Sequence, residues 1–296
     1  MALSRLAPDL SRARVQRLLE EGRVRLEGRV PKAAARLRGG ERLQVEVPEP
    51  EPSGLLPQDL PLSVLYQDAD LLVLDKAPGM VVHPARGSPH STVVNALLHL
   101  LGKGPGGGRL GLVHRLDKET SGCLAVARTE AALRELQAAF KARRVEKTYL
   151  ALCHGRLPDE GRLDTPYGRH PRERTRFTSK VRSVRRAVTA WRVRERFGEA
   201  ATLAEVTLHT GRTHQIRVHL SESGHPLLGD AAYGGRRRES RLPPTHPVRR
   251  AAEALGRQAL HALRLSFDHP RTGQRVTFEA PVPEDLAAAL GILRGR

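Results

Sequence analysis

Residues 111–122 read Gly-Leu-Val-His-Arg-Leu-Asp-Lys-Glu-Thr-Ser-Gly. A strand-like apolar run ends here in a dense set of polar groups, and the ends of strands are common places for functional sites. The carboxylate of Asp117 could serve as a nucleophile or as a general base. An Asp followed by Thr120 and Ser121 is also typical of a turn cap. These residues alone leave the role of Asp117 open between chemistry and turn formation.

A second polar cluster is Leu208-His-Thr-Gly-Arg-Thr-His-Gln-Ile-Arg-Val-His-Leu220. Gly211 ends a predicted strand, and Thr213 can cap the helix that follows. His214 and Arg217, three residues apart, would then share a helical face. Because an Arg can hold a carboxylate through two hydrogen bonds and a helix N-terminus favours an anion, the cluster predicts an Asp–Arg pair in a cleft.

A third candidate is Tyr149, in the predicted strand over 147–153. Lys147, Tyr149 and Ala151 alternate onto one face of this strand. A tyrosine in a strand is most often a core residue, so the pattern alone favours packing over catalysis.

The histidines and cysteines do not form the patterns that hold metals. Four histidines lie in or next to the second cluster: His209, His214, His219 and His225. They are spread over a predicted strand, helix and loop, with no Cys partner and no His-Glu-x-x-His spacing. The only cysteines, Cys123 and Cys153, are too few for a disulfide scaffold, and we expect reduced thiols. The sequence therefore predicts neither a metal nor a disulfide framework.

The charge of the chain indicates a polyanionic partner. The 296 residues include 50 Lys and Arg against 32 Asp and Glu, a formal net charge of +18. Aromatic residues make up only 3% of the chain, so we expect nucleic acid to be held mainly through its phosphates by Arg. From Arg169 to Arg196, eleven cations face only Glu173 and Glu195, which predicts a loop-like insert that contacts phosphate.

No stretch approaches the roughly 18 consecutive apolar residues of a membrane span. Residues 1–15 interleave Arg and Asp where a signal peptide would have an apolar core. We therefore expect a cytoplasmic protein with no membrane partner.

Composition divides the chain into three parts. Residues 1–47 predict a helix and a small basic sheet, an arrangement suited to binding RNA. The predicted helix turns three arginines outward: Arg12, Arg14 and Arg17. Residues 48–61 contain five prolines, three acids and no cation, which is typical of a semi-rigid linker. Residues 62–296 form the second domain.

The second domain mixes short strands and helices in an irregular order. Strands are predicted over 63–66, 71–74, 110–116, 123–127, 147–153 and 203–209. Helices are predicted over 93–101, 130–141, 214–223 and 283–290. Such an order predicts the α+β class with a mainly antiparallel mixed sheet flanked by helices and loops.

Together these segments resemble the pseudouridine synthases that modify large-subunit ribosomal RNA, in the branch with an N-terminal S4-like RNA-binding domain. The resemblance spans nearly the whole chain. Its most specific motifs are His114-Arg-Leu-Asp-Lys-Glu-Thr-Ser-Gly122 and Gly211-Arg-Thr-His-Gln-Ile-Arg-Val-His219. Further matches cover 75–84, 147–149, 224–235, 260–262 and 280–283. One departure is that the family's opening helix is shortened before Ala2-Leu3.

The resemblance implies roles for individual residues. Asp117 becomes the catalytic aspartate, Arg217 pairs with it and keeps it ionised, and Tyr149 stacks beneath the uracil and can relay a proton. The target nucleotide must leave its stem, and Arg115 is placed to fill the vacated space, a phosphate contact being the alternative. Three further residues are implied to face the RNA or to support the site: Lys76, His83 and His114.

The implied reaction is the isomerisation of specific uridines to pseudouridine in large-subunit ribosomal RNA, with no cofactor and no metal. The carboxylate can attack the sugar or assist formation of a glycal. A non-catalytic RNA-binding or ribosome-assembly protein with the same fold would need no Asp117. A base-excising glycosidase would release free uracil. We expect a monomer whose partner is ribosomal RNA or its precursor particle.

Overall fold

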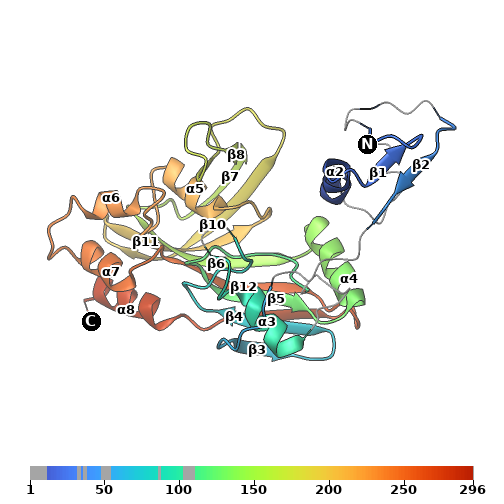
Figure 1. The fold of residues 1–296 in the computed structure, drawn as a ribbon. Helices are drawn as coiled ribbons and strands as arrows, with labels where there is room; N and C mark the ends of the chain where they lie inside the picture. Colours follow the sequence, from blue (N-terminus) through green and yellow to red (C-terminus); the bar gives the residue numbers. More distant parts are fainter. Residues whose placement is uncertain are drawn as a thin grey trace. The chain divides into compact units, whose positions relative to one another are not determined.

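The computed structural model describes residues 12–31, 35, 39–47, 55–85, 88–102 and 111–295. The chain forms two compact units, Met1–Gly54 and Leu55–Arg296 (Figure 1). None of the described helices is long and apolar enough to cross a membrane.

The smaller unit contains helix α2 (Arg12–Glu20) and an antiparallel pair, β1 (Val24–Leu26) and β2 (Leu43–Val45). Val15 and Leu18 on the helix are buried against Val24. The helix and both strands agree with the elements predicted from the sequence.

The arginines predicted to bind RNA from this unit are Arg12, Arg14 and Arg17. Their backbone lies in α2, but their side chains fall outside the described part of the chain. Their contact with RNA stays a prediction.

The larger unit is built on a nine-stranded mixed sheet with the order β3-β4-β5-β12-β6-β11-β10-β7, in which β13 also pairs with β12 (Figure 1). The strands are β3 (Ser63–Gln67), β4 (Leu71–Lys76), β5 (Ser121–Ala127), β6 (Glu146–His154), β7 (Glu160–Pro166), β10 (Arg186–Phe197), β11 (Ala201–Leu208), β12 (Leu260–Asp268) and β13 (Arg275–Glu279). Within this sheet only β5 and β12 pair in parallel. The predicted α+β class with a mainly antiparallel sheet is confirmed.

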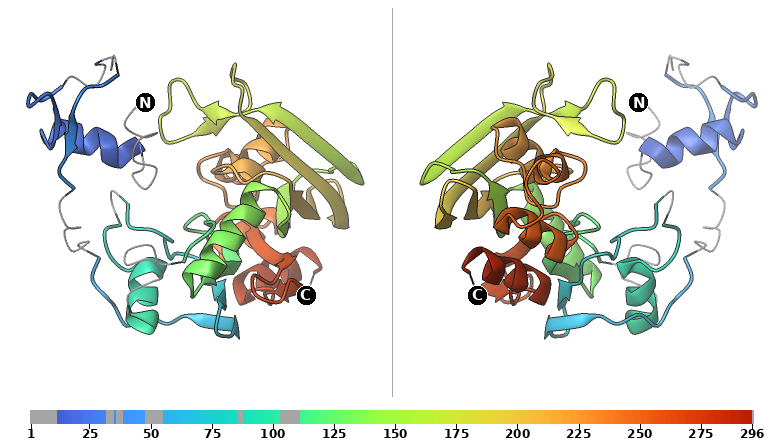
Figure 2. Two further views of the ribbon diagram at one scale, coloured as in Figure 1. Left: turned by 90° about the vertical axis from the view of Figure 1, so that its right-hand side faces the viewer. Right: turned by 90° about the vertical axis from the view of Figure 1, so that its left-hand side faces the viewer.

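Helices cover both faces of the sheet, as the side views in Figure 2 show. Because side chains alternate along a strand, Tyr149 and Ala151 of β6 share one core cluster with helices α3 (Val93–Leu101) and α5 (Gln215–Glu222). Leu150 and Leu152 share another with α7 (Pro247–Leu255) and α8 (Glu284–Leu293). Helix α4 (Glu130–Lys141) packs on β5, and the short α6 (Gly235–Glu239) precedes α7.

Local sequence explains where α4 begins. The Thr129 hydroxyl accepts the Ala132 N–H at 3.2 Å, Glu130 lies in the first turn and Lys141 in the last. The negative charge at the N-terminus and the positive charge at the C-terminus both interact favourably with the helix dipole. The bounds of α3 and α4 match the prediction.

Residues 111–116 do not form the strand predicted there. Leu112 makes only an isolated bridge to Val126. Gly111 has φ 38°, and a Cβ at this position would lie 1.7 Å from the Ala127 carbonyl oxygen. The segment therefore lies close beside the end of β5 at a glycine, but its strand pairing is limited to this one bridge.

The basic segment 169–196 is not a loop-like insert. It contains β9 (Phe177–Thr178), which pairs with β8 (Gly168–Arg169), and most of β10. In β10, exposed Arg192 and Arg194 alternate with Val193, which packs against the core. The strand was not predicted because its many cations suggested a loop. They are tolerated in β10 because one face of this strand is open to solvent.

Residues 55–61, predicted as the end of the linker, belong to the larger unit. The Gln58 N–H donates to the Asn95 carbonyl at 3.0 Å, and Asn95 Nδ2 donates to the Leu56 carbonyl at 2.8 Å. The prolines in this stretch give an extended chain that packs on α3. Residues 48–54 lie outside the described part of the chain.

Candidate active site

A pocket of about 460 Å³ opens on the larger unit beside Asp117. Its walls come from the 113–120 segment, the end of α4, strand β6 and the junction between β11 and α5. The three residues given catalytic roles by resemblance all line it: Asp117, Tyr149 and Arg217. The fold therefore gathers residues that are far apart in the sequence.

Asp117 and Arg217 form the ion pair that the sequence predicts. Arg217 Nη1 donates to Asp117 Oδ2 at 3.1 Å, and the two side chains are 8% and 17% exposed. The Asp117 carbonyl also accepts the Thr120 N–H at 3.1 Å, so Asp117 closes a turn as well as facing the pocket. The two interpretations of this residue are compatible.

Asp230 is the residue that orients Arg217, and sequence reasoning gave it no role. Arg217 Nε and Nη2 donate to the two carboxylate oxygens of Asp230 at 2.7 and 2.9 Å. Asp230 is fully buried and also accepts the N–H groups of Ala232 and Tyr233. Burial opposes the charge of Arg217, but the two carboxylates outweigh it and raise its pKa. The only sequence signal was an acid within the 224–235 match.

Arg257 supports the Asp117 turn from the far end of the chain. Its guanidinium donates to the Glu119 carbonyl at 3.0 Å and forms a bidentate pair with Asp285. Beside it, Ser121 Oγ lies 3.0 Å from His261 Nδ1, across the parallel pairing of β5 with β12. The turn that carries Asp117 is thus held by residues of the last 40 or so positions.

Tyr149 lies on β6 opposite Val206 and is 8% exposed. Burial, and then the charge of Asp117, raise the pKa of its phenol well above the usual range. The ring is therefore a neutral, apolar wall of the pocket with its hydroxyl available for hydrogen bonding.

His214 does not lie within helix α5, in contrast to the prediction. Helix α5 begins at Gln215, and His214 precedes it in the left-handed conformation, with φ 59° and no side-chain cap. Thr213 is not the cap, because His214 occupies the N-cap position; the Thr213 carbonyl accepts the Tyr167 hydroxyl. His214 and Arg217 therefore do not share a helical face, yet His214 Nε2 lies 4.0 Å from Asp117 Oδ2.

Of the two roles predicted for Lys76, contact with RNA or support of the site, its bonds in the structure favour support of the site. It is 2% exposed, and Nζ donates to the carbonyls of Ala77, Met80 and Lys118 at 2.6, 2.9 and 3.0 Å. These three bonds use every ammonium hydrogen. Burial lowers the pKa of Lys76 to about 8. Lys76 fastens the segment after β4 to the turn that contains Asp117.

His114 lines the pocket, and its contacts agree with support of the site, one of the two roles predicted for it. Its Nε2 accepts the Ala125 N–H at 2.9 Å, and its ring stacks on Phe140 with centroids 4.9 Å apart. Burial lowers the pKa of His114 to about 3, so the ring is neutral. It ties the 113–117 segment to β5 and α4.

Arg115 and His83 are the two predicted RNA-facing residues that the structure exposes. Arg115 lines the pocket. Burial, and then the nearby Arg115 charge, lower the pKa of His83. Their positions are compatible with contact to RNA, which stays a prediction.

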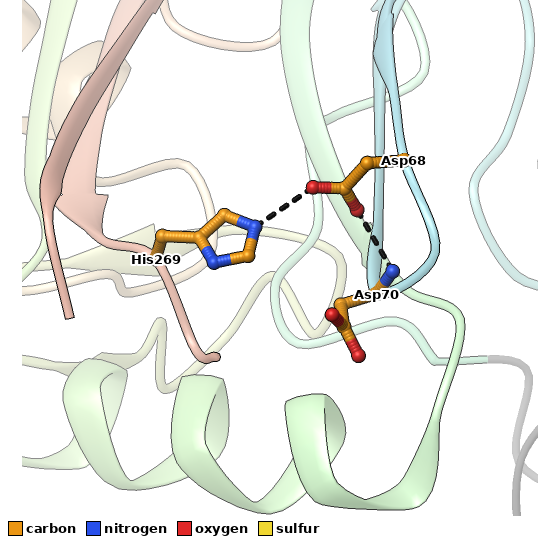
Figure 3. A group of neighbouring side chains, drawn as sticks. All are labelled: Asp68, Asp70 and His269. Atoms are coloured by element: carbon orange, nitrogen blue, oxygen red, sulfur yellow. Dashed lines mark hydrogen bonds and ion pairs between the residues drawn. The ribbon is translucent and has the colours of Figure 1, made fainter. Parts of the chain in front are cut away.

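Among the described residues, one group has the spacing of metal ligands: Asp68, Asp70 and His269 (Figure 3). Its ligand atoms already have partners. His269 Nδ1 accepts the N–H groups of Arg271 and Thr272, so Nε2 carries the hydrogen that bonds Asp68 at 2.8 Å. Asp70 pairs with Arg271. The group fits a hydrogen-bonded junction between two turns better than a metal site.

A family model described as RNA pseudouridylate synthase matches residues 70–222, and the chain belongs to this family. It is an RNA pseudouridine synthase, an isomerase that converts uridine in RNA to pseudouridine, as the resemblance predicted.

Several curated proteins are similar over nearly the full chain. A protein of Xanthomonas campestris named ribosomal large subunit pseudouridine synthase D is 44% identical over 99% of this chain and 87% of its own length. A protein of Vibrio parahaemolyticus with the same name is 41% identical over 99% and 90%. An RNA pseudouridine synthase of Chloroflexus aurantiacus is 46% identical over 98% and 87%.

Solved structures support the fold. The human RNA pseudouridylate synthase domain containing 1 aligns with a TM-score of 0.60 and 28% identity over 77% of this chain and 87% of that chain. The human domain containing 4 aligns with a TM-score of 0.59 and 25% identity over 78% and 93%.

Proposed function

We propose that this enzyme isomerises specific uridines of large-subunit ribosomal RNA, with Asp117 as the carboxylate that acts on the ribose. The observation that carries the proposal is the Asp230–Arg217–Asp117 chain of ion pairs, which runs from a buried acid to a partly exposed one at the wall of a pocket. The names of the similar proteins support ribosomal RNA as the substrate.

The reaction rearranges one bond and consumes no other group. The bond between N1 of uracil and C1′ of ribose breaks, the free base turns, a bond forms between C5 and C1′, and the proton on C5 leaves. Asp117 can attack C1′ or take a proton from C2′ to form a glycal. Arg217 holds the carboxylate in place, so that it is correctly oriented toward the ribose of a bound nucleotide.

The pocket keeps the freed uracil from diffusing away. Tyr149 supplies an apolar ring on which the base can stack, and its neutral hydroxyl can relay a proton. Arg115, exposed at the mouth, can occupy the gap that the flipped nucleotide leaves in the RNA. Exclusion of water favours rejoining of the base over its release.

The smaller unit would add binding energy for RNA. We propose that it is an S4-like RNA-binding domain, supported by its helix, its two short strands and the basic residues of this segment. A ribosomal RNA substrate would also place the enzyme in the cytoplasm, where we expect it to act as a monomer.

The test is Asp117→Asn, which keeps the shape of the side chain and removes its charge. We expect release of tritium from C5 of uridine in transcribed ribosomal RNA to fall at least about a thousandfold, with RNA affinity unchanged. Asp159→Asn, at a side chain that is 87% exposed, is the control and should keep full activity. Activity of Asp117→Asn within tenfold of wild type would refute the assignment.

The same assay separates the alternative functions. A glycosidase would release free uracil in place of pseudouridine. A protein that only binds RNA would show no tritium release in the wild type.

A further inference from the structure

We propose that His214 is a positioning residue that donates a hydrogen bond from Nε2 to Oδ2 of Asp117 when the target nucleotide is bound, leaving Oδ1 to act on the ribose. This inference rests on the proposed role of Asp117. Four observations on the free enzyme support it: the backbone of His214, the partner of its Nδ1 atom, its charge and the position of Asp117.

The backbone holds His214 in a conformation that costs energy. A φ of 59° in a non-glycine residue is uncommon and is unfavourable unless its surroundings enforce it. Both neighbours are locked: Tyr167 donates to the Thr213 carbonyl at 2.7 Å, and Gln215 Nε2 donates to the Val188 carbonyl at 3.0 Å. With this backbone conformation, the imidazole lies at the pocket wall and faces Asp117.

Tyr233 determines which nitrogen of His214 carries the hydrogen. His214 Nδ1 lies 2.8 Å from the Tyr233 hydroxyl, which also accepts the Phe177 N–H at 3.0 Å. A backbone N–H can only donate, so the hydroxyl hydrogen needs its own acceptor, and within the described residues Nδ1 is the acceptor in reach. His214 is thereby the Nε2–H tautomer, and its free N–H is the one directed to Asp117.

The surroundings keep this imidazole neutral. Burial lowers the pKa of His214; Asp117 and Asp230 oppose that shift, whereas Arg217 and Arg115 add to it. The rings of Phe177 and Tyr233 meet His214 edge-on at 5.8 and 5.5 Å, which fixes its plane. A neutral donor can orient Asp117 without adding a second positive charge beside Arg217.

The two donors converge on the same oxygen. Arg217 Nη1 lies 3.1 Å and His214 Nε2 4.0 Å from Oδ2. A distance of 4.0 Å is too long for a hydrogen bond, but contacts in free enzymes often tighten when substrate fills the site. A shift of about 1 Å would complete the second bond and stop the carboxylate from rotating.

Two substitutions of His214 test the contributions of Nδ1 and Nε2 separately. His214→Asn tolerates the left-handed backbone and retains a polar group near the Nδ1 position, but has nothing at the position of Nε2. We expect kcat to fall about tenfold to a hundredfold with KM unchanged, as for the loss of one hydrogen bond to a charged group. His214→Gln places an amide N–H near Nε2 and should recover part of the lost kcat. Equal losses in both variants, or kcat of His214→Asn within twofold of wild type, would overturn the proposal.

The tautomer can be measured directly on the wild-type enzyme. Nitrogen NMR of protein labelled with ¹⁵N-histidine reports which ring nitrogen is protonated, and the His214→Gln spectrum identifies the signal. We expect Nε2–H in the wild type and a mixture of tautomers in Tyr233→Phe. A wild-type Nδ1–H form would overturn the proposal even if the variants are unstable. This result does not depend on catalysis, so it stays distinct from failure of the Asp117 assignment.

Discussion

The Arg217 guanidinium connects the two acids of the site. It lies between Asp230 and Asp117, and its planar shape allows two bonds to one carboxylate while a third N–H reaches the other. One buried cation therefore serves a structural acid and a reactive one. Its geometry matters as much as its charge.

Arg217→Lys tests that geometry. Lysine keeps the charge but cannot bond both acids in this arrangement, so we expect kcat to fall about a hundredfold or more while the Kd for RNA changes by less than about threefold. Tritium release and filter binding would measure the two quantities. Arg186→Lys, at the half-exposed pair with Asp164, is the matched control. Similar losses of turnover and affinity would instead indicate a phosphate-binding role for Arg217.

For single residues, the sequence predicted which side chains form the site better than it predicted the contacts that each of them makes. Asp117 and Arg217 were paired correctly because both lie in specific motifs. The roles of Lys76 and His114 were left open between RNA contact and support of the site, because a polar residue in a motif looks the same whether it bonds backbone or RNA. Asp230 was missed because its role depends on a loop that folds back onto α5, and no spacing reveals that contact.

Among the elements, α3 and α4 were predicted with their exact bounds, whereas helices α6 and α7 and several strands were not predicted. Thr129 and the apolar period of α4 specify that helix locally. Strand β10 was hidden by its arginines, and β12 and β13 were not predicted although β12 lies centrally in the sheet. Strands gain much of their stability from partners distant in sequence, so local patterns understate them.

Two turns of the sheet are joined by Asp68. Its carboxylate accepts hydrogen bonds from Tyr66, from the backbone after it and from His269 in the turn between β12 and β13. Burial opposes ionisation of Asp68, but these bonds outweigh it and lower its pKa. The ionised form is therefore the one that stabilises this junction.

This shift predicts a pH-dependent stability. Because the folded pKa lies below the ordinary value of about 3.9, the contribution of Asp68 is complete above that value and is lost as the pH falls toward the folded pKa. Asp68→Asn should lower the free energy of unfolding at pH 7, and its difference from wild type should shrink below about pH 4. Urea denaturation at pH 7, 4 and 3 would show this. Asp59→Asn, at a 90% exposed side chain, serves as the control, and a difference independent of pH would contradict the prediction.

For the whole molecule, the division into units sets where the chain can be cut. Deletion through Gly54 should leave a folded larger unit, whereas deletion through Pro61 also removes the chain that bonds Asn95 and should lower its melting temperature. The shorter deletion should weaken RNA capture, because it removes tethered contacts and phosphate neutralisation.

Turnover measured against RNA concentration at two salt levels tests this prediction. We expect reduced rates at low RNA, a flatter salt dependence, and nearly the wild-type rate at saturating RNA. A folded 55–296 fragment that is inactive at saturating RNA would mean that the smaller unit helps to build the active site.

The support of the Asp117 turn by Arg257 has a consequence for the order of events in biosynthesis. Asp117 is translated at least 140 residues before Arg257, His261 and Asp285, which lie at its turn in the folded chain. During translation the carboxylate of Asp117 is therefore present before the residues that support its turn. We therefore expect the Asp117 turn to reach its final geometry only after the segment with Arg257 and Asp285 has been made and has folded onto it.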